Sequence, residues 1–303
     1  MAVAARLIGA AQSPGMGILP AAEAGLATFT VLRAWRDWMR NSGRYAETTQ
    51  RQYVRYMTGF LGDVLIPLEI LTEADIIRYL DDLPPRGGMR GATLRTLKCF
   101  YRFAVIRGYM DDDPTWDLRI PRQKYGEAPS LTEQELAQVL VMAEKLDPRA
   151  RPTLELMYAT GARVGSICEV LPEEVNLVRQ SIYFRVAKGD KPYTNPLGPR
   201  GMRAALKLLE LRDFVPPRAG KRRPTLVGVA PVVVQRWAKE SGEMAGVRVW
   251  THLLRHTFCE RIANNPATPE LVTVELMNWR DGAQLRRYAS ARLPLKRDAV
   301  AGL

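Results

Sequence analysis

Residues 251–262 read THLLRHTFCERI and contain both histidines of the 303-residue chain, His252 and His256, with Arg255 between them. The stretch is typical of a helix, and residues three or four apart share one helix face, so His252 can act with either Arg255 or His256. Three interpretations are open from these residues alone: a zinc site, a phosphate-handling site and an ordinary packed helix.

The zinc interpretation is the weakest of the three. Two histidines at this spacing form a metalloprotease site when a glutamate follows the first, and Leu253 stands there instead. The chain has no third histidine and no Asp or Glu cluster at ligand spacing. Its three cysteines are widely separated, which fits neither a disulfide framework nor a metal site and predicts a reduced, intracellular protein.

The composition is globular and strongly basic, with 47% hydrophobic residues and a formal net charge of +12. Such an excess predicts a polyanionic partner, most simply nucleic acid, with an anionic membrane surface as the rival. No run approaches the roughly 18 apolar residues of a membrane helix, and the N-terminus lacks the pattern of a signal peptide. We therefore expect no membrane partner and a cytoplasmic location.

Periodicity predicts a mainly α (α+β overall) fold in two domains. We expect a flexible N-terminal arm over 1–25, a helical domain over 26–120, a linker over 121–130 and a mostly helical second domain with a small β-hairpin or sheet over 131–303. Capping-box spacing predicts two helix starts, at Thr72 with Asp75 and at Ser130 with Glu133.

Basic residues follow helical spacing in the first domain, as Arg51 with Arg55 and as Arg95, Lys98 and Arg102. A single basic stripe is as readily a solvated face as a DNA contact. Two stripes on one small helical unit of a basic protein favour contact with phosphates.

Three more elements support the phosphate interpretation. TGARVGS places Arg163 directly after a glycine turn, and AKGDKPYTNPL places Lys188 at a hairpin tip. ELMNWRDGAQLRRYAS places Trp279 nine residues before Tyr288. Taken in order with HLLRHTF, these elements resemble the tyrosine recombinases, which include phage integrases and Xer-type recombinases, over nearly the whole chain.

The resemblance implies a site-specific DNA recombinase whose helical front half binds the core site. Its catalytic residues would be Arg163, Lys188 (Lys191 being the less favoured lysine), His252, Arg255, Trp279 and Tyr288. The Tyr288 hydroxyl would attack a DNA phosphodiester and form a 3′-phosphotyrosyl intermediate, the arginines and Trp279 would stabilise the transition state, and Lys188 would protonate the leaving oxygen. His256 would brace the site. Such chemistry needs no metal, nucleotide or other cofactor.

The implied partners are double-stranded DNA recombination sites and further copies of the chain. A free monomer or weak oligomer would form a homo-tetramer on synapsed DNA, with a directionality factor as a further partner and a bacterial host as the setting. In this family the tail after the nucleophile docks on a neighbouring protomer, which would here be the tail after Tyr288.

Two departures from the family pattern stand out. Ser166 occupies a position where the family carries an acidic residue, and Tyr193 replaces an arginine of the hairpin. We expect a phage or mobile-element integrase. The alternatives are an Xer-like recombinase that resolves chromosome or plasmid dimers, a type IB topoisomerase-like enzyme, a DNA-binding protein with a decayed site and a basic helical regulator.

Overall fold

The structure is a computed structural model that describes residues 21–64, 66–84, 88–119, 129–185, 191–211, 224–288 and 300–301, without the side chains of 21–27, 286 and 287. Lys188 and most of the expected arm, linker and C-terminal tail therefore lie outside the described residues. The chain divides into two compact units, 1–124 and 125–303, and the cut falls within the predicted linker. Each unit is described by itself.

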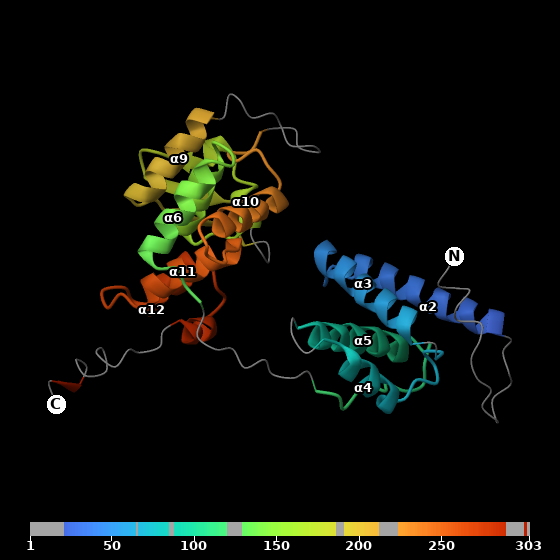
Figure 1. Ribbon diagram of the computed structural model, residues 1–303. Helices are drawn as coiled ribbons and strands as arrows, with labels where there is room; N and C mark the ends of the chain where they lie inside the picture. Colours follow the sequence, from blue (N-terminus) through green and yellow to red (C-terminus); the bar gives the residue numbers. More distant parts are fainter. Residues whose placement is uncertain are drawn as a thin grey trace. The chain divides into compact units, whose positions relative to one another are not determined.

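The described part of the first unit is a helical bundle (Figure 1). Its helices are α2 (Ala21–Asn41), α3 (Glu47–Asp63), α4 (Glu73–Asp82) and α5 (Met89–Ile106). Helix α5 packs against the other three, and its side chains Leu97, Phe100 and Tyr101 are fully buried. Helix α2 begins at Ala21, inside the segment expected to be an arm.

One of the two predicted helix starts is confirmed and the other is wrong. Thr72 and Asp75 form a reciprocal capping box at the start of α4, as expected. In the second unit the capping residue is Thr132 with Glu135, two residues after the predicted pair. Thr132 and Glu135 form the same kind of reciprocal box, and Leu131 before it is buried and donates its N–H to the Thr257 hydroxyl at 3.0 Å.

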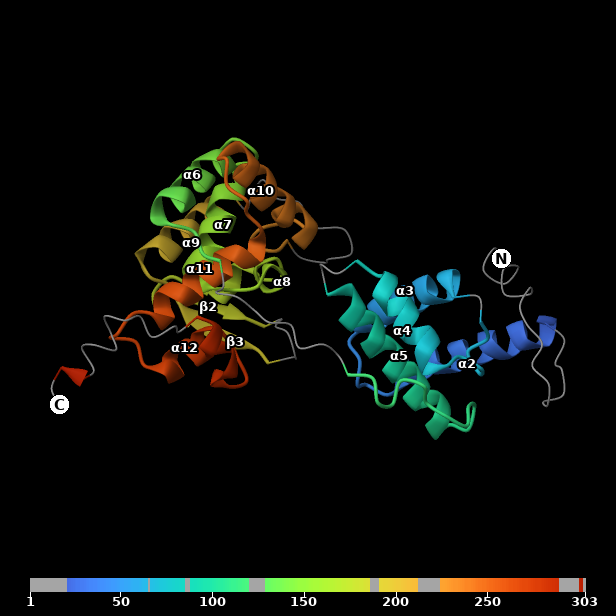
Figure 2. The ribbon, with the colours of Figure 1, turned by 60° about the horizontal axis from the view of Figure 1, so that its bottom comes forward.

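The second unit is built around α7 (Ala150–Thr160), which packs against α6, α9, α10 and α11 and also contacts α8 (Figure 2). The remaining elements are α6 (Glu133–Glu144), α8 (Val164–Ile167), η2 (Pro172–Glu174), α9 (Pro199–Leu211), α10 (Pro231–Met244), α11 (Thr251–Ala263), α12 (Glu270–Leu276), η4 (Gly282–Arg287) and three short strands. The mainly α class is confirmed. In the described ranges, no helix combines the length and apolar character that a bilayer span requires.

The three strands form an antiparallel sheet in the order β1 (Val175–Asn176), β2 (Ser181–Phe184) and β3 (Tyr193–Pro196). The predicted hairpin is β2 with β3, in which Ile182 pairs with Asn195 and Phe184 with Tyr193. Ile182 and Phe184 are fully buried, so alternate residues of β2 face the core. The hairpin tip at which Lys188 is expected lies outside the described residues.

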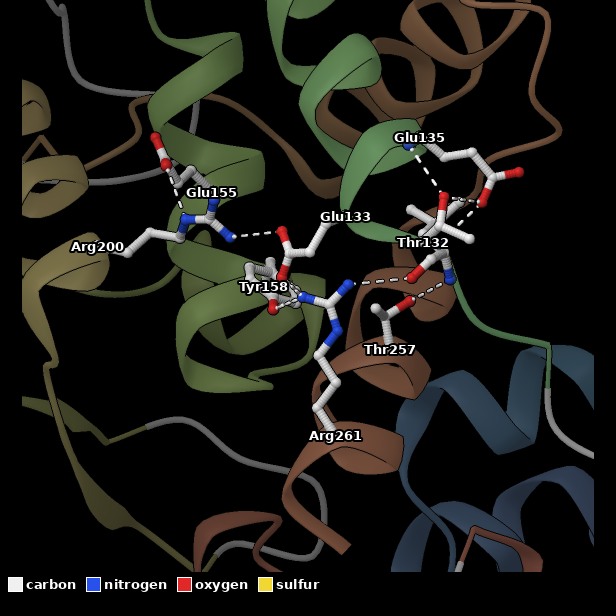
Figure 3. A network of polar contacts seen from close by, with 9 residues as sticks. Thr132, Glu133, Glu135, Glu155, Tyr158, Arg200, Thr257 and Arg261 are labelled. Atoms are coloured by element: carbon white, nitrogen blue, oxygen red, sulfur yellow. Dashed lines mark hydrogen bonds and ion pairs between the residues drawn. The ribbon is translucent and has the colours of Figure 1, made fainter. Parts of the chain in front are cut away.

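Helix α11 is held against α6 and α7 by one arginine (Figure 3). The Arg261 guanidinium forms an ion pair with Glu133, donates to the Tyr158 hydroxyl and donates to the Leu131 carbonyl at 3.1 Å. Arg200 of α9 forms ion pairs with the same Glu133 and with Glu155 of α7. This network locks in place the helix that carries both histidines.

Candidate active site

The glycine turn predicted before Arg163 ends α7. Gly161 has a φ of 63°, in the left-handed region, and a Cβ there would lie 2.4 Å from the Phe258 ring. Glycine is therefore required both by the backbone and by the space available. The chain leaves this turn so that Arg163 becomes the residue that precedes α8, with a half-buried side chain.

Among the expected catalytic residues that the structure describes, Arg255 is the most deeply buried, with 3% of its surface exposed. Its guanidinium donates to the Gly161 and Met277 carbonyls, each at 2.6 Å. Burial and, next, the charge of Arg163 lower the pKa of Arg255 to about 10, so it is a cation at neutral pH. Among the described residues neither arginine is ion-paired with a carboxylate, and such a pair of guanidinium groups suits a phosphate.

Asn195 of β3, which the sequence analysis did not single out, braces the same site. It is 2% exposed, and its side-chain amide donates to the Thr160 and Leu276 carbonyls, each at 2.9 Å. Those carbonyls directly precede the ones that Arg255 binds. The available signal was a polar amide residue within a short strand, where asparagine is uncommon.

Tyr288 lies in a small apolar cluster at the end of η4. The side chains of Tyr288 and Trp279 are 7% and 9% exposed, and their rings stack with centroids 5.7 Å apart. The Tyr288 hydroxyl is hydrogen-bonded to Nδ1 of His256. The Tyr288 hydroxyl is also near enough to Arg255 to interact with it electrostatically, which raises the pKa of the guanidinium and partly offsets the effect of burial. The structure thus brings together Arg163, Arg255, Trp279 and Tyr288, although α7 and η4 are far apart in the sequence.

The two histidines occupy different positions on α11. His252 is exposed, whereas His256 is half-buried against Tyr288. Their rings meet edge to face, with centroids 4.8 Å apart. The spacing correctly predicted that they share a helix face, but the contact of His256 with the Tyr288 hydroxyl could not be read from it. In the ranges described, no three His, Cys, Asp or Glu side chains are grouped to hold a metal ion.

The two departures from the family pattern meet in space. The Tyr193 ring stacks on Phe184 with centroids 4.7 Å apart. Burial raises the pKa of the Tyr193 hydroxyl, while Arg255, Arg163 and a contact with Ser166 oppose that rise. A neutral tyrosine and serine therefore stand beside the two arginines, at positions where the family pattern has an arginine and an acid.

The residues just before β3, at the turn end of the hairpin, are tied to the segment before Trp279. Asn278 adopts a left-handed conformation, with a φ of 44°, and its side chain donates to the Lys191 carbonyl at 3.0 Å. The Lys191 side chain is exposed. The catalytic assignment of Lys188 stays a prediction because the described residues do not include it.

The predicted basic stripes of the first unit are only partly available to a partner. Arg55, Arg95 and Arg102 are exposed, and Arg51 is exposed while ion-paired with Glu47. Lys98 instead donates to the carbonyls of Thr115 and Trp116 and holds the turn after α5. Contact with DNA remains a prediction for all five residues.

Other nucleophile candidates are less suited to the reaction. The Tyr101 hydroxyl is buried and donates to the Leu68 carbonyl at 3.0 Å, and burial raises its pKa well above the usual value. Burial also raises the pKa of the Cys259 thiol to about 12. Both groups are therefore held in their neutral forms.

Comparison with known proteins identifies the class. A family model described as the phage integrase family matches residues 129–293. The tyrosine recombinase XerA of Pyrococcus furiosus is 28% identical over 239 residues, which cover 75% of this chain and 78% of that protein. The tyrosine recombinase XerD of Xanthomonas campestris is 31% identical over 203 residues, covering 60% of this chain and 61% of that protein.

Solved structures agree on the fold. A lambda integrase dimer bound to a COC' core site has a TM-score of 0.71 at 17% identity, covering 87% of this chain and 95% of that one. The Tn1549 transposon integrase in complex with a circular intermediate DNA has a TM-score of 0.69 at 16% identity, covering 90% and 99%.

The fold and the sequence matches together define a tyrosine recombinase, the class expected from the ordered motifs, and hence a site-specific recombination enzyme. The chain belongs to the phage integrase family.

Proposed function

We propose that the chain cuts and rejoins double-stranded DNA through a 3′-phosphotyrosyl link to Tyr288, as the integrase of a phage or mobile element. The observation that carries the proposal is the buried Arg255, which lies beside Arg163 and within electrostatic reach of Tyr288. Two cations without a carboxylate partner among the described residues, next to a tyrosine hydroxyl, provide an anion site and a nucleophile for a phosphodiester.

Each residue then has a definite part in the reaction. Tyr288 Oη attacks phosphorus, the bond to the 5′ oxygen breaks, and Lys188 supplies the proton to that oxygen. Arg163 and Arg255 neutralise the charge that builds on the phosphate oxygens, and the Trp279 indole N–H donates to one of them. His252, on the exposed side of α11, assists proton movement. Since the covalent link conserves the bond energy, rejoining needs neither ATP nor a metal ion.

The first unit would hold the DNA through the exposed arginines of α3 and α5. Each contact between an arginine and a phosphate steepens the salt dependence of binding by about one unit in a log–log plot. Arg95→Gln and Arg102→Gln should each lower that slope, whereas Lys98→Gln should lower the melting temperature because Lys98 holds the turn at 115–116. Unchanged slopes in both arginine variants would exclude α5 as the contact surface.

Assembly on DNA is proposed from the relatives. Lambda integrase has been solved as a dimer on a core site and as a tetramer on a Holliday junction. We expect four copies of this chain to join on two synapsed sites in the bacterial cytoplasm, with a directionality factor favouring one outcome. Cross-linking of the protein with and without its DNA sites tests the assembly.

The direct test is a nicked DNA substrate that traps the cleaved state. Incubation without metal or nucleotide, followed by a denaturing gel, should show a protein–DNA adduct that Tyr288→Phe abolishes. An adduct that survives in Tyr288→Phe would exclude this nucleophile. Sequence-specific binding without any adduct would favour a decayed recombinase that only binds DNA.

Resolution of chromosome or plasmid dimers is the second candidate function, and the Xer relatives favour it. The two roles differ in the arrangement of sites that supports strand exchange. Plasmids that carry sites on separate molecules report integration, and plasmids with direct repeats report resolution. Efficient reaction between two different, unlinked sites supports the integrase, and reaction restricted to direct repeats on one molecule supports the resolving enzyme.

A further inference from the structure

His256 lies between Tyr288 and His252, the other histidine of the chain. Its Nδ1 is hydrogen-bonded to the Tyr288 hydroxyl, and the two rings are 5.4 Å apart. On its other side the ring meets His252 edge to face. Because His252 is exposed and Tyr288 is buried, the three rings form a continuous series from the surface to the proposed nucleophile.

Arg255 and His256 are consecutive residues of α11, but their side chains contact different parts of the site. Consecutive helical residues point about 100° apart, so Arg255 turns into the interior toward the Gly161 and Met277 carbonyls while His256 turns toward Tyr288. Arg255 favours the ionised form of the hydroxyl, and His256 is in position to receive its proton.

The chemistry of a tyrosine nucleophile calls for such an acceptor. A phenol with an ordinary pKa near ~10 is almost wholly protonated at neutral pH, and its oxygen attacks effectively when a base takes the proton during the attack. Histidine is the side chain whose ordinary pKa lies nearest to neutral pH. In the described part of the chain, His256 is the histidine bonded to the Tyr288 hydroxyl.

We infer that His256 is a catalytic residue, the general base for Tyr288. Resting on the function proposed above, the step moves the Tyr288 Oη proton to His256 Nδ1 as the Oη–P bond forms and the bond to the 5′ oxygen breaks. The leaving oxygen receives its proton from Lys188. In rejoining, the 5′-hydroxyl attacks phosphorus and gives its proton back to Lys188, the Oη–P bond breaks, and His256 returns its proton to Oη as the tyrosine leaves. His252 serves the phosphate side of the site and is not the base.

The test separates proton acceptance from positioning. The Nδ2 or Oδ1 atom of asparagine reaches the place of histidine Nδ1, so His256→Asn can keep a hydrogen bond to Tyr288 without being able to take up a proton. His256→Gln is the second variant, should the first be unstable, and His252→Asn is the matched control. Melting temperature and DNA affinity establish that each variant is folded and bound.

Single-turnover adduct formation is then measured across pH on two nicked substrates, one with the natural 5′ oxygen and one with sulfur in its place. The wild-type rate should rise with pH through the histidine range near ~6.5. His252 and Tyr288 contact His256, and Arg255 and Glu260 are its neighbours along α11, so these four groups set the exact midpoint. His256→Asn should lose this rise and be slower by roughly 10²-fold or more, while His252→Asn keeps the rise.

The sulfur substrate distinguishes the base from the acid, because a thiolate leaves without needing a proton. Sulfur should rescue Lys188→Ala and should not rescue His256→Asn. A His256→Asn enzyme with the wild-type rate and pH profile, or one rescued by sulfur, would overturn the assignment. If the wild type forms no adduct, or if Tyr288→Phe still forms one, the proposed function itself has failed. A tyrosine-dependent adduct that is indifferent to His256 rejects the base alone.

Discussion

Arg255 and Asn195 bind consecutive carbonyls at the same two helix ends. The Arg255 guanidinium donates hydrogen bonds to the Gly161 and Met277 carbonyls. The Asn195 side-chain amide donates to the Thr160 and Leu276 carbonyls. These carbonyls lie at the C-terminal ends of α7 and α12, where helix carbonyls lack partners within the helix. A helix residue and a strand residue thus satisfy the two ends and clamp them together beneath the proposed phosphate site.

Replacing Asn195 should loosen this clamp. Asn195→Leu keeps most of the volume but leaves buried carbonyls unsatisfied, so we expect a loss of roughly 2–4 kcal/mol in the free energy of unfolding. Denaturant titration measures it, with Thr194→Ala on the exposed side of the same strand as the control. An equal effect of both changes would show that the side-chain amide of Asn195 contributes little.

Arg255→Lys should impair catalysis even though the charge is kept. One ammonium group cannot reproduce the planar fork that reaches two carbonyls and still presents N–H groups to a phosphate. We expect adduct formation to slow by roughly 10²–10³-fold, as for the loss of other donors that stabilise a transition state. Single-turnover cleavage at saturating protein measures this, and a rate like that of the wild type would show that charge alone suffices.

Gly161→Ala should destabilise the second unit. The new Cβ would lie within 2.4 Å of the Phe258 ring and occupy a residue with φ 63°, so we expect a cost of roughly 2–4 kcal/mol from strain and overpacking. Gly165→Ala is the matched control, since a Cβ there meets no atom within 4 Å. Thermal unfolding of the two variants should differ clearly, and similar melting temperatures would contradict the close packing at Gly161.

Arg261→Met should weaken the attachment of α11 to α6 and α7. The change keeps an apolar stem but removes the bonds to Glu133, Tyr158 and Leu131 (Figure 3), for which we expect a loss of about 1–3 kcal/mol. Arg236→Met on α10 removes an exposed ion pair with Glu240, 3.9 Å long, and should change stability by less than about 0.5 kcal/mol. Chemical denaturation compares the two, and equal losses would argue against the network.

Asp147 should contribute to the acid sensitivity of the second unit. A hydrogen bond from Arg149 is the main reason that its pKa lies below the usual value. Because the folded-state pKa is depressed, the stabilisation is present above the unfolded-state pKa and is lost as pH falls through the folded-state pKa. Asp147→Asn should therefore lower stability at neutral pH and lose less on acidification than the wild type. Parallel pH dependences in the two proteins would contradict this.

The sequence by itself determined the elements and the class. Apolar periodicity indicated the helical first unit and the small hairpin of the second, because burial of one face imposes a regular spacing on each element. The order of the motifs around Arg163, Arg255, Trp279 and Tyr288 was enough to indicate the family that the comparison then showed. Local pattern failed at Ser130, because Thr132 with Glu135 has the same spacing as Ser130 with Glu133 and is the pair that caps α6.

Only the tertiary structure decided how the site residues act on one another. The carbonyl partners of Arg255 lie 94 and 22 residues from it, and those of Asn195 lie 35 and 81 residues away. Helical spacing placed His252 and His256 on one face but could not say which one meets Tyr288. The stripe on α5 likewise could not show that Lys98 is bound to the turn at 115–116. Hydrogen bonds between distant segments depend on how the helices pack, and spacing along the chain does not encode that packing.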